Sequence, residues 1–489
     1  MSLRIVLAFG FVLAMSGDVW ADGMRPTDVA HLETVESPDV LAMPDPPELR
    51  EKLSLASTSP KVRYARYPLP LYDAYFTAWG PPTVHSNGKV YSALGDHRGR
   101  RGDCYIYEFD PDTECLRCVA NLQQATPELT RADFGFGKIH GRMSEGPDGC
   151  LYFSSWWGPE TEDSDLFKGE RVFRFDPETN LIEDMGIPAF GWGAPSTRLY
   201  GPDMLLYGET NERLGNSQGD PNKDFLTTGY KSWDDNLHTR FMVYDLRNRR
   251  LKFLGGHEGT SAGRDFFVDA GGNAYFNNGK GKLQRYDRIA NTVSSFPLTM
   301  PDRLLRRAAG PDPNGVYYGV TKEKHIVFRF DPSKPSIETV AELPWEVSAF
   351  DLDPSGQSAY YVSLHSDMQK SSVVALIRLD LRSGRQTVIA LLDKPIKSLV
   401  DQRLFKPKAT AATQSQSVSQ TQQAKTMPAS QEAQSTENRN NEGYFMGGRY
   451  GLAISRDGRS VYMPINGVIE LKDKWKACPL FVVVELPQD

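Results

Sequence analysis

The chain has 489 residues, of which 39% are hydrophobic and 24% are charged, so it is long enough to bury a large core. Its 56 basic and 62 acidic residues give a formal net charge of -6 without a basic block, which argues against a nucleic-acid-binding surface. We therefore expect a small molecule, a glycan or another protein as the partner, and no nucleic acid.

Residues 1–21 have the pattern of a secretory signal peptide. Arg4 supplies a positive charge, residues 5–15 form an apolar core, and Val19 to Ala21 offers a small-residue cleavage site. The apolar core is shorter than the roughly 20 residues of a transmembrane helix, although an uncleaved anchor is the alternative. We expect an exported monomer, periplasmic or extracellular, with no membrane span after cleavage.

Residues 22–60 are rich in proline and acidic residues with little periodicity, which is typical of an extended or partly helical arm. From residue 61 onward one pattern recurs: a short β run, a turn with Asp and Gly, an aromatic-rich strand, a variable loop and two further strands. It is clearest in HGRMSEGPDGCLYFSS at 140–155, followed by ERVFRFDPETNLIEDMG at 170–186. This pattern is typical of the four-stranded meander of a propeller blade.

Seven copies of the pattern predict an all-β fold for residues 61–489, a seven-bladed β-propeller of four-stranded antiparallel blades. The seventh copy lacks an outermost strand, which residues 62–75 could supply by closing the ring, at an edge because of Pro68 and Pro70. Residues 408–441 contain Gln, Ser, Thr and Ala with almost no large apolar residue, so we expect a disordered insertion between the sixth and seventh blades.

Five cysteines form an odd set for an oxidising compartment. The Cys115–Cys118 spacing is that of a redox motif, but the predicted strand around it lacks the βα context of such motifs. A hairpin about residues 110–113 would bring Cys104 opposite Cys118 or one residue away. A structural disulfide between Cys104 and Cys118 is therefore the leading interpretation.

The loops before each innermost strand and after each second strand meet at one face of a propeller, around its axis. Aligning the blades on their turns predicts a cationic rim with histidines at that face. The catalytic candidates are His140, His97 and Tyr230, and the ligand-binding candidates are Arg264, Arg307, Arg449, Trp157, Asn211, Lys322 and His365.

Such a rim indicates a pocket for an anionic ligand. An arginine fork pairs well with a carboxylate, and a neutral imidazole can move a proton near neutral pH. The alternative is that these side chains pair with acids such as Asp265 and Glu145, or line a water-filled channel.

The sequence assigns no metal site and no cofactor. A divalent cation is the alternative. The acidic stretch from Glu160 to Asp165 lacks the spacing and the glycine of an EF-hand loop, so a solvated loop is the better interpretation. No nucleophile elbow, phosphate loop or HExxH motif is present in the sequence.

Turn motifs in several blades resemble a known group. GPDGCLYFSS at 146–155 resembles the signature of streptogramin-lyase-like and gluconolactonase-like propellers, and DPSGQSAYYV and SRDGRSVYM look like the corresponding turns of lactonase-type propellers. The resemblance implies a seven-bladed propeller and points to metal-assisted lyase or lactone-hydrolase chemistry. His365 and Glu346 lack the spacing of the lyases' His and Glu, so no catalytic residue is carried over.

Two functions fit these observations. One is a lyase that acts on an acidic saccharide or small ester in an axial pocket, with Arg neutralising the carboxylate and His or Tyr moving protons. The other is a non-catalytic propeller that binds a glycan or a protein. The gathering of His and Arg at one opening favours the lyase.

Overall fold

The structure is a computed structural model of the whole chain. It describes residues 29–44, 50–68, 76–95, 103–126, 136–156, 169–188, 196–211, 239–255, 265–277, 280–363, 365–367, 371–405, 443–446, 451–471 and 474–487.

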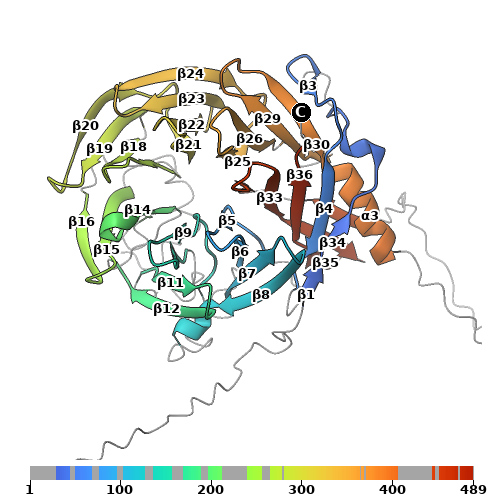
Figure 1. Cartoon of the computed structure of the whole chain (residues 1–489), viewed down its shortest axis with the longest axis horizontal. Coiled ribbons are helices and arrows are strands. Elements are labelled where there is room, and N and C mark those ends of the chain that lie inside the picture. Colours follow the sequence, from blue (N-terminus) through green and yellow to red (C-terminus); the bar gives the residue numbers. More distant parts are fainter. Residues whose placement is uncertain are drawn as a thin grey trace, which may run out of the picture.

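Seven antiparallel sheets form a ring around a central axis, which confirms the seven-bladed β-propeller (Figure 1). From the axis outward, the strands of the first four blades are β5 (Thr83–Val84), β6 (Val90–Gly95), β7 (Cys104–Asp110) and β8 (Cys115–Asn121); β9 (Ser144–Glu145), β10 (Leu151–Ser154), β11 (Val172–Asp176) and β12 (Leu181–Gly186); β13 (Thr197–Tyr200), β14 (Leu205–Asn211), β15 (Thr239–Asp245) and β16 (Arg250–Leu254); and β17 (Phe267–Val268), β18 (Ala274–Asn277), β19 (Lys282–Asp287) and β20 (Thr292–Thr299).

The remaining three blades follow the same order, with additions in the last two. Their strands are β21 (Leu305–Ala309), β22 (Tyr317–Thr321), β23 (Ile326–Asp331) and β24 (Ser336–Glu342); β25 (Val347–Leu352), β26 (Ser358–Ser363), β29 (Ala375–Asp380) and β30 (Gln386–Leu391); and β32 (Ala453–Ile454), β33 (Ser460–Ile465), β36 (Leu480–Glu485) and β4 (Lys61–Arg66).

Every blade is built by the same local chemistry. Alternate apolar side chains point into the spaces between neighbouring blades, where Phe241 of one blade stacks on Phe276 of the next at 4.4 Å. In the turn after β9, the Asp148 carboxylate accepts a bond from the Cys150 amide at 3.2 Å, and Gly149 takes a positive φ of 74°.

The N-terminal strand β4 closes the ring, as the sequence predicted. It pairs antiparallel with β36, and Val62 lies opposite Val484. The strand ends before Pro68, and β2 (Glu33–Thr34) pairs on its outer side, so β4 is not the edge that the prolines suggested.

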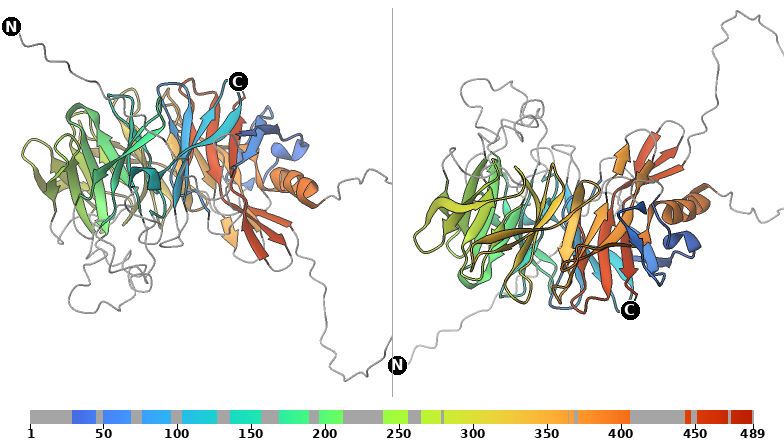
Figure 2. Two further views of the ribbon diagram at one scale, coloured as in Figure 1. Left: turned by 90° about the horizontal axis from the view of Figure 1, so that it is seen from below. Right: turned by 90° about the horizontal axis from the view of Figure 1, so that it is seen from above.

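Several elements add to the ring. On its outer side, β1 (Val29–His31) pairs with β8, and β3 (Ser54–Leu55) runs parallel to β30. The helix α3 (Asp393–Phe405) follows β30, and a hairpin of β27 (His365–Asp367) and β28 (Ser371–Val373) extends the sixth blade. A small sheet of β31 (Gly443–Met446), β34 (Gly467–Leu471) and β35 (Lys474–Ala477) projects from one face (Figure 2).

Short 3-10 turns complete the described elements: η1 (Pro38–Val40), η3 (Leu122–Ala125) and η5 (Gly201–Asp203). The sequence predicted neither α3 nor the small sheet. The predicted insertion at 408–441 lies outside the described residues.

The predicted disulfide between Cys104 and Cys118 is wrong, because all five cysteines are free thiols. The turn spans residues 111–114, with Glu114 in the left-handed conformation at φ 56°, so Asp110 pairs with Cys115 and Tyr107 with Cys118. Cys104 then packs toward the second blade and Cys118 toward the seventh, on opposite faces of the sheet.

The inner strands all run in one direction along the axis. We call the side on which they begin the start face and the side on which they end the end face; the predicted rim belongs to the start face. Within the described ranges, no helix is long and apolar enough to cross a bilayer.

Candidate functional site

Two loop segments run together from the start face toward the axis. One leads into β5 and contains Trp79 and Pro81, and the other leads into β9 and contains His140 and Arg142. They touch backbone to backbone, because a Cβ placed on Gly80 would lie 2.5 Å from the Gly141 carbonyl oxygen. The Asn466 side chain fixes the first segment by bonding both the amide and the carbonyl of Ala78, at 2.6 and 2.9 Å.

His140, the first catalytic candidate, lies in an aromatic cage. Its ring stacks on Trp79 at 6.1 Å and meets Trp156 edge-on at 4.9 Å, between ring centroids. The Lys138 ammonium group lies 3.4 Å from the Trp79 centroid and 4.6 Å from the Trp156 centroid, in the geometry of a cation–π contact. The histidine is only 2% exposed, so the described residues hold its ring firmly in place.

All seven blades line an axial cavity, to which the two loop segments contribute Pro81 and Arg142. Its volume is about 20 Å³, enough for one or two water molecules. A carboxylate or similar small group can therefore enter it, whereas a sugar ring has to remain above. The lining includes Pro81, Arg142, Arg198, Asp265, Arg307, Phe350 and Gly451.

Three arginines from three different blades dominate this lining. Arg142 precedes β9, Arg198 lies in β13 and Arg307 in β21, and the last is buried with 6% exposure. One of the arginines that the sequence predicted, Arg307, is thus placed at the axis.

Two aspartates partly neutralise these arginines. The Arg142 Nη2 atom lies 2.7 Å from an Asp351 carboxylate oxygen, and Arg198 binds Asp265 through Nε at 3.1 Å and Nη2 at 2.8 Å. Burial disfavours the charge on Arg142, but Asp351 outweighs this effect and raises the arginine's pKa above its ordinary value. The three arginines and two aspartates leave one net positive charge. The alternative expected from the sequence was that an arginine of the rim pairs with Asp265. Such a pair is present, but its arginine is Arg198, which was not among the predicted residues.

The other candidates fall into three groups. Asn211 ends β14 and His365 begins β27, so their backbones lie on the start face, while nothing is described of their side chains. Lys322 follows β22 on the same face, outside the cavity lining, and its amide donates to the Leu304 carbonyl at 2.9 Å. The candidates that lie outside the described residues, and stay predictions, are His97, Tyr230, Arg264, Arg449 and Trp157.

The sequence analysis missed Trp79, Lys138, Arg142 and Arg198. Lys138 and Arg142 stand two residues before and after His140, so an alternating pattern along this loop was a usable signal. Arg198 gave none, because its position at the axis depends on how the third blade packs against its neighbours.

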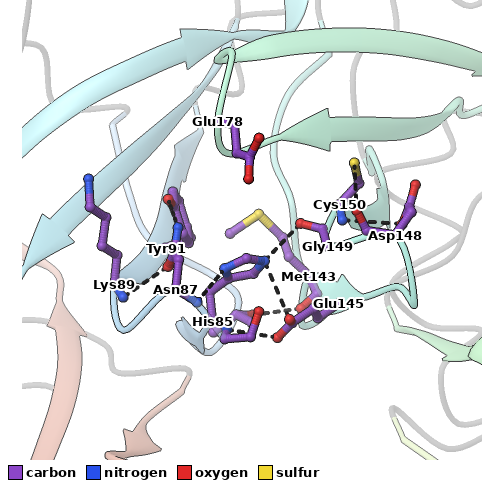
Figure 3. A network of polar contacts seen from close by, with 12 residues as sticks. His85, Asn87, Lys89, Tyr91, Met143, Glu145, Asp148, Gly149, Cys150 and Glu178 are labelled. Carbon is purple, nitrogen blue, oxygen red and sulfur yellow. Dashed lines mark hydrogen bonds and ion pairs between the residues drawn. The ribbon is translucent and has the colours of Figure 1, made fainter.

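A second buried histidine belongs to the end face (Figure 3). The His85 Nδ1 atom accepts a bond from the Asn87 amide at 3.1 Å, which leaves the proton on Nε2, 2.8 Å from the Gly149 carbonyl oxygen. The Glu145 carboxylate lies 3.5 Å from Nε2, accepts the Ser86 amide at 3.1 Å and pairs with Arg456 at 3.3 Å. This network joins the first, second and seventh blades.

Among the described side chains, no group of three or more His, Cys, Asp or Glu is arranged to hold a metal ion.

The sequence matches no protein-family model and no curated protein. Among solved structures, the chain is similar to an oligogalacturonate lyase in complex with manganese, with 12% identity, coverage of 95% of this chain and 99% of the other, and a TM-score of 0.51. It is also similar to a 6-phosphogluconolactonase-like protein from Bacteroides uniformis, with 12% identity, coverage of 76% and 90%, and a TM-score of 0.40.

At this identity the first similarity shows the fold alone, and the second carries no argument. The expected resemblance to lactonase- and lyase-type propellers is thereby confirmed for the fold.

Proposed function

We propose that this protein is an exported lyase that cleaves an acidic saccharide at the start face of its propeller. The observation that carries the proposal is the convergence of Arg142, Arg198 and Arg307 on one axial cavity, in which Arg142 stands two residues after His140 in the chain. Export rests on residues 1–21 alone, and the mass of the purified chain would show whether cleavage follows Ala21.

The axial cavity fits one part of such a substrate. A uronate carries its carboxylate at the edge of the sugar ring, and a cavity of about 20 Å³ with net positive charge can admit this group while excluding the ring. The ring would then lie above the cavity, on the side of Trp79, which is partly exposed, whereas Trp156 is buried with 4% exposure.

The chemistry is a β-elimination. A base removes the proton from the carbon next to the carboxylate, the electrons of that C–H bond form the C=C bond, and the C–O bond to the neighbouring sugar breaks. The arginines stabilise the negative charge that develops on the carboxylate, and an acid protonates the departing oxygen. His140 and the predicted His97 and Tyr230 are the candidates for these proton transfers.

The solved structure named above, which shares the fold, is a lyase of oligogalacturonate, so uronate polymers are the first substrate class to test. A small ester, the other substrate considered from the sequence, has no comparable support.

The test is an ultraviolet absorbance assay of the purified chain against a panel of uronate-containing polysaccharides, with and without calcium or manganese. We expect the absorbance of an unsaturated uronate to appear with at least one polymer and with no neutral polymer. A panel that stays silent in every condition would contradict the lyase proposal.

A non-catalytic glycan-binding propeller is the second candidate, because one observation favours it. Arg142 and Arg198 already pair with aspartates, and His140 is almost fully enclosed by indoles. If the panel is silent but the same uronate polymers raise the melting temperature, while neutral polymers do not, this second function is supported.

A further inference from the structure

The end face carries a cavity that the proposed function does not use. Its volume is about 400 Å³, within the range of small-ligand pockets, which begins near 300 Å³. Four blades contribute to its lining, at the ends of their inner strands and in the turns that follow. The lining includes Ser144, Arg198, Tyr200, Phe267, Ala270 and Tyr317.

The walls of this cavity are aromatic and fixed in place. The Tyr317 hydroxyl donates to the Val268 carbonyl at 2.8 Å, and the Arg288 guanidinium lies 5.2 Å from the centroid of the Tyr200 ring. Phe267 and Tyr317 are buried, with 1% and 4% exposure, so the partly exposed Tyr200 is the ring that a ligand meets, while the Ser144 hydroxyl supplies a polar atom. Both features suit a ring with an apolar face and hydroxyls at its edge.

Arg198 provides the cationic group. Its Nε and Nη2 atoms bind Asp265, and Nη2 also donates to the Ala308 carbonyl at 2.8 Å. Its Nη1 atom makes no hydrogen bond to the residues that the structure describes, and the side chain is 27% exposed. Two N–H donors are thus left for a ligand at this arginine.

The acidic residue at this cavity is already engaged. The Asp269 carboxylate accepts bonds from the Asn273 amide and side chain, at 2.8 and 2.9 Å, and from the Tyr275 hydroxyl at 2.9 Å. Both of its oxygens are therefore occupied by the turn that follows β17, and the charged group at this cavity with hydrogen-bond donors left for a ligand is Arg198.

We propose that this cavity is a second binding site, which takes a single sugar ring that carries a carboxylate. The site does not rest on the proposed lyase activity, because its opening is on the opposite face and only Arg198 is shared with the axial cavity.

The test is calorimetric titration of the full chain with galacturonate and, as the neutral match, galactose. A monosaccharide has no sugar at its leaving position, so the proposed elimination cannot consume it. We expect galacturonate to bind and galactose to bind at least about tenfold more weakly, as the loss of one charge-assisted hydrogen bond implies. Equal binding of the two sugars, or no binding of galacturonate, would overturn the proposal.

Two variants place the binding at the end face. Ala270 is exposed at the cavity rim and makes no part of the ion pair, so Ala270→Trp should cover the opening and remove the binding that belongs to the end face, while the chain stays folded. Arg198→Lys should weaken binding about tenfold, because lysine lacks the planar fork with which Arg198 binds Asp265 and Ala308 and still presents two N–H donors to a ligand.

Arg329→Lys is the matched control, since Arg329 pairs with Glu338 on outer strands far along the blade. It should bind galacturonate like the parent chain. If Ala270→Trp retains full binding, the ligand does not occupy the end face and the proposal is refuted.

Discussion

Individual charges in this protein are held by fixed partners on neighbouring strands. Glu108 in β7 is 2% exposed and accepts bonds from Lys89 at 2.9 Å, Arg117 at 2.7 Å and the Tyr91 hydroxyl at 2.9 Å. Burial alone would raise the pKa of the Glu108 carboxyl, but these three donors outweigh it and lower the pKa below the ordinary value of about 4.5.

Glu108→Gln should therefore destabilise the protein in a pH-dependent way. A lowered folded-state pKa contributes stability above the unfolded value, and this contribution is lost as the pH falls through the folded value. We expect a loss on the order of 2 kcal/mol at neutral pH, as for hydrogen bonds to a buried charge, that shrinks below about pH 4.5. Urea unfolding at neutral pH and at about pH 4 measures both.

The matched control for this substitution is Glu338→Gln, because Glu338 forms an exposed pair with Arg329. It should change the free energy of unfolding by less than about 1 kcal/mol at either pH. A Glu108→Gln loss that stays constant across the two pH values would contradict the assigned role of the carboxylate.

The cysteines give a second prediction at this scale. Burial raises the pKa of the Cys104 thiol well above its ordinary value and that of Cys150 to about 12, whereas Cys115 is partly exposed, with its sulfur 3.3 Å from the His31 Nδ1 atom. Without reductant, we expect a thiol reagent to label five cysteines in denaturant and only Cys115 in the folded chain.

Cys115→Ser should then abolish labelling of the folded chain. Three labelled cysteines in denaturant would instead mean that a disulfide forms, against the structure.

Among the elements, β4 closes the ring, because it joins the N-terminal part of the chain to the last blade. Val62 is 1% exposed and packs in the core cluster shared by the sixth and seventh blades. The strand therefore links residues that are more than 400 positions apart in the sequence, since Lys61 pairs with Glu485.

Val62→Ala should lower the free energy of unfolding by about 2 kcal/mol, through lost apolar contact and a residual cavity. Lys61→Ala, at an exposed position of the same strand, should change it by no more than about 0.5 kcal/mol. Chemical denaturation of both variants tests this. Equal losses of unfolding free energy would mean that the packing of β4 does not stabilise the closed ring.

At the scale of the whole molecule, the ring was predictable because its signals are local and repeated. Turns such as those at Asp148, Asp353 and Asp457 each bind their own backbone and fix the same hairpin in different blades. The missing strand of the seventh blade was predictable for the same reason, since six complete copies showed what it needed.

The separation of Cys104 from Cys118 and the position of Arg198 depend on contacts that no local pattern encodes. The thiols of Cys104 and Cys118 lie on opposite faces because the turn begins later than expected and the pairing shifts after Ile106. Arg198 reaches the axis and pairs with Asp265 of the next blade, 67 positions away, so a single sequence gives no sign of the pair.

The central claim is that the start face carries the reaction, and two buried histidines allow one comparison to test it. His140 lies in the cage at the start face, and His85 joins three blades at the end face. The measurement is the rate of elimination per folded molecule, with the melting temperature, for His140→Gln and His85→Gln against the parent chain. We predict that His140→Gln loses at least about a hundredfold in rate, as for loss of a general acid or base, with little change in melting temperature. His85→Gln should lower the melting temperature and keep the rate. A His140→Gln variant that keeps the parent rate, or that melts as early as His85→Gln, would contradict the claim and make His140 a structural residue.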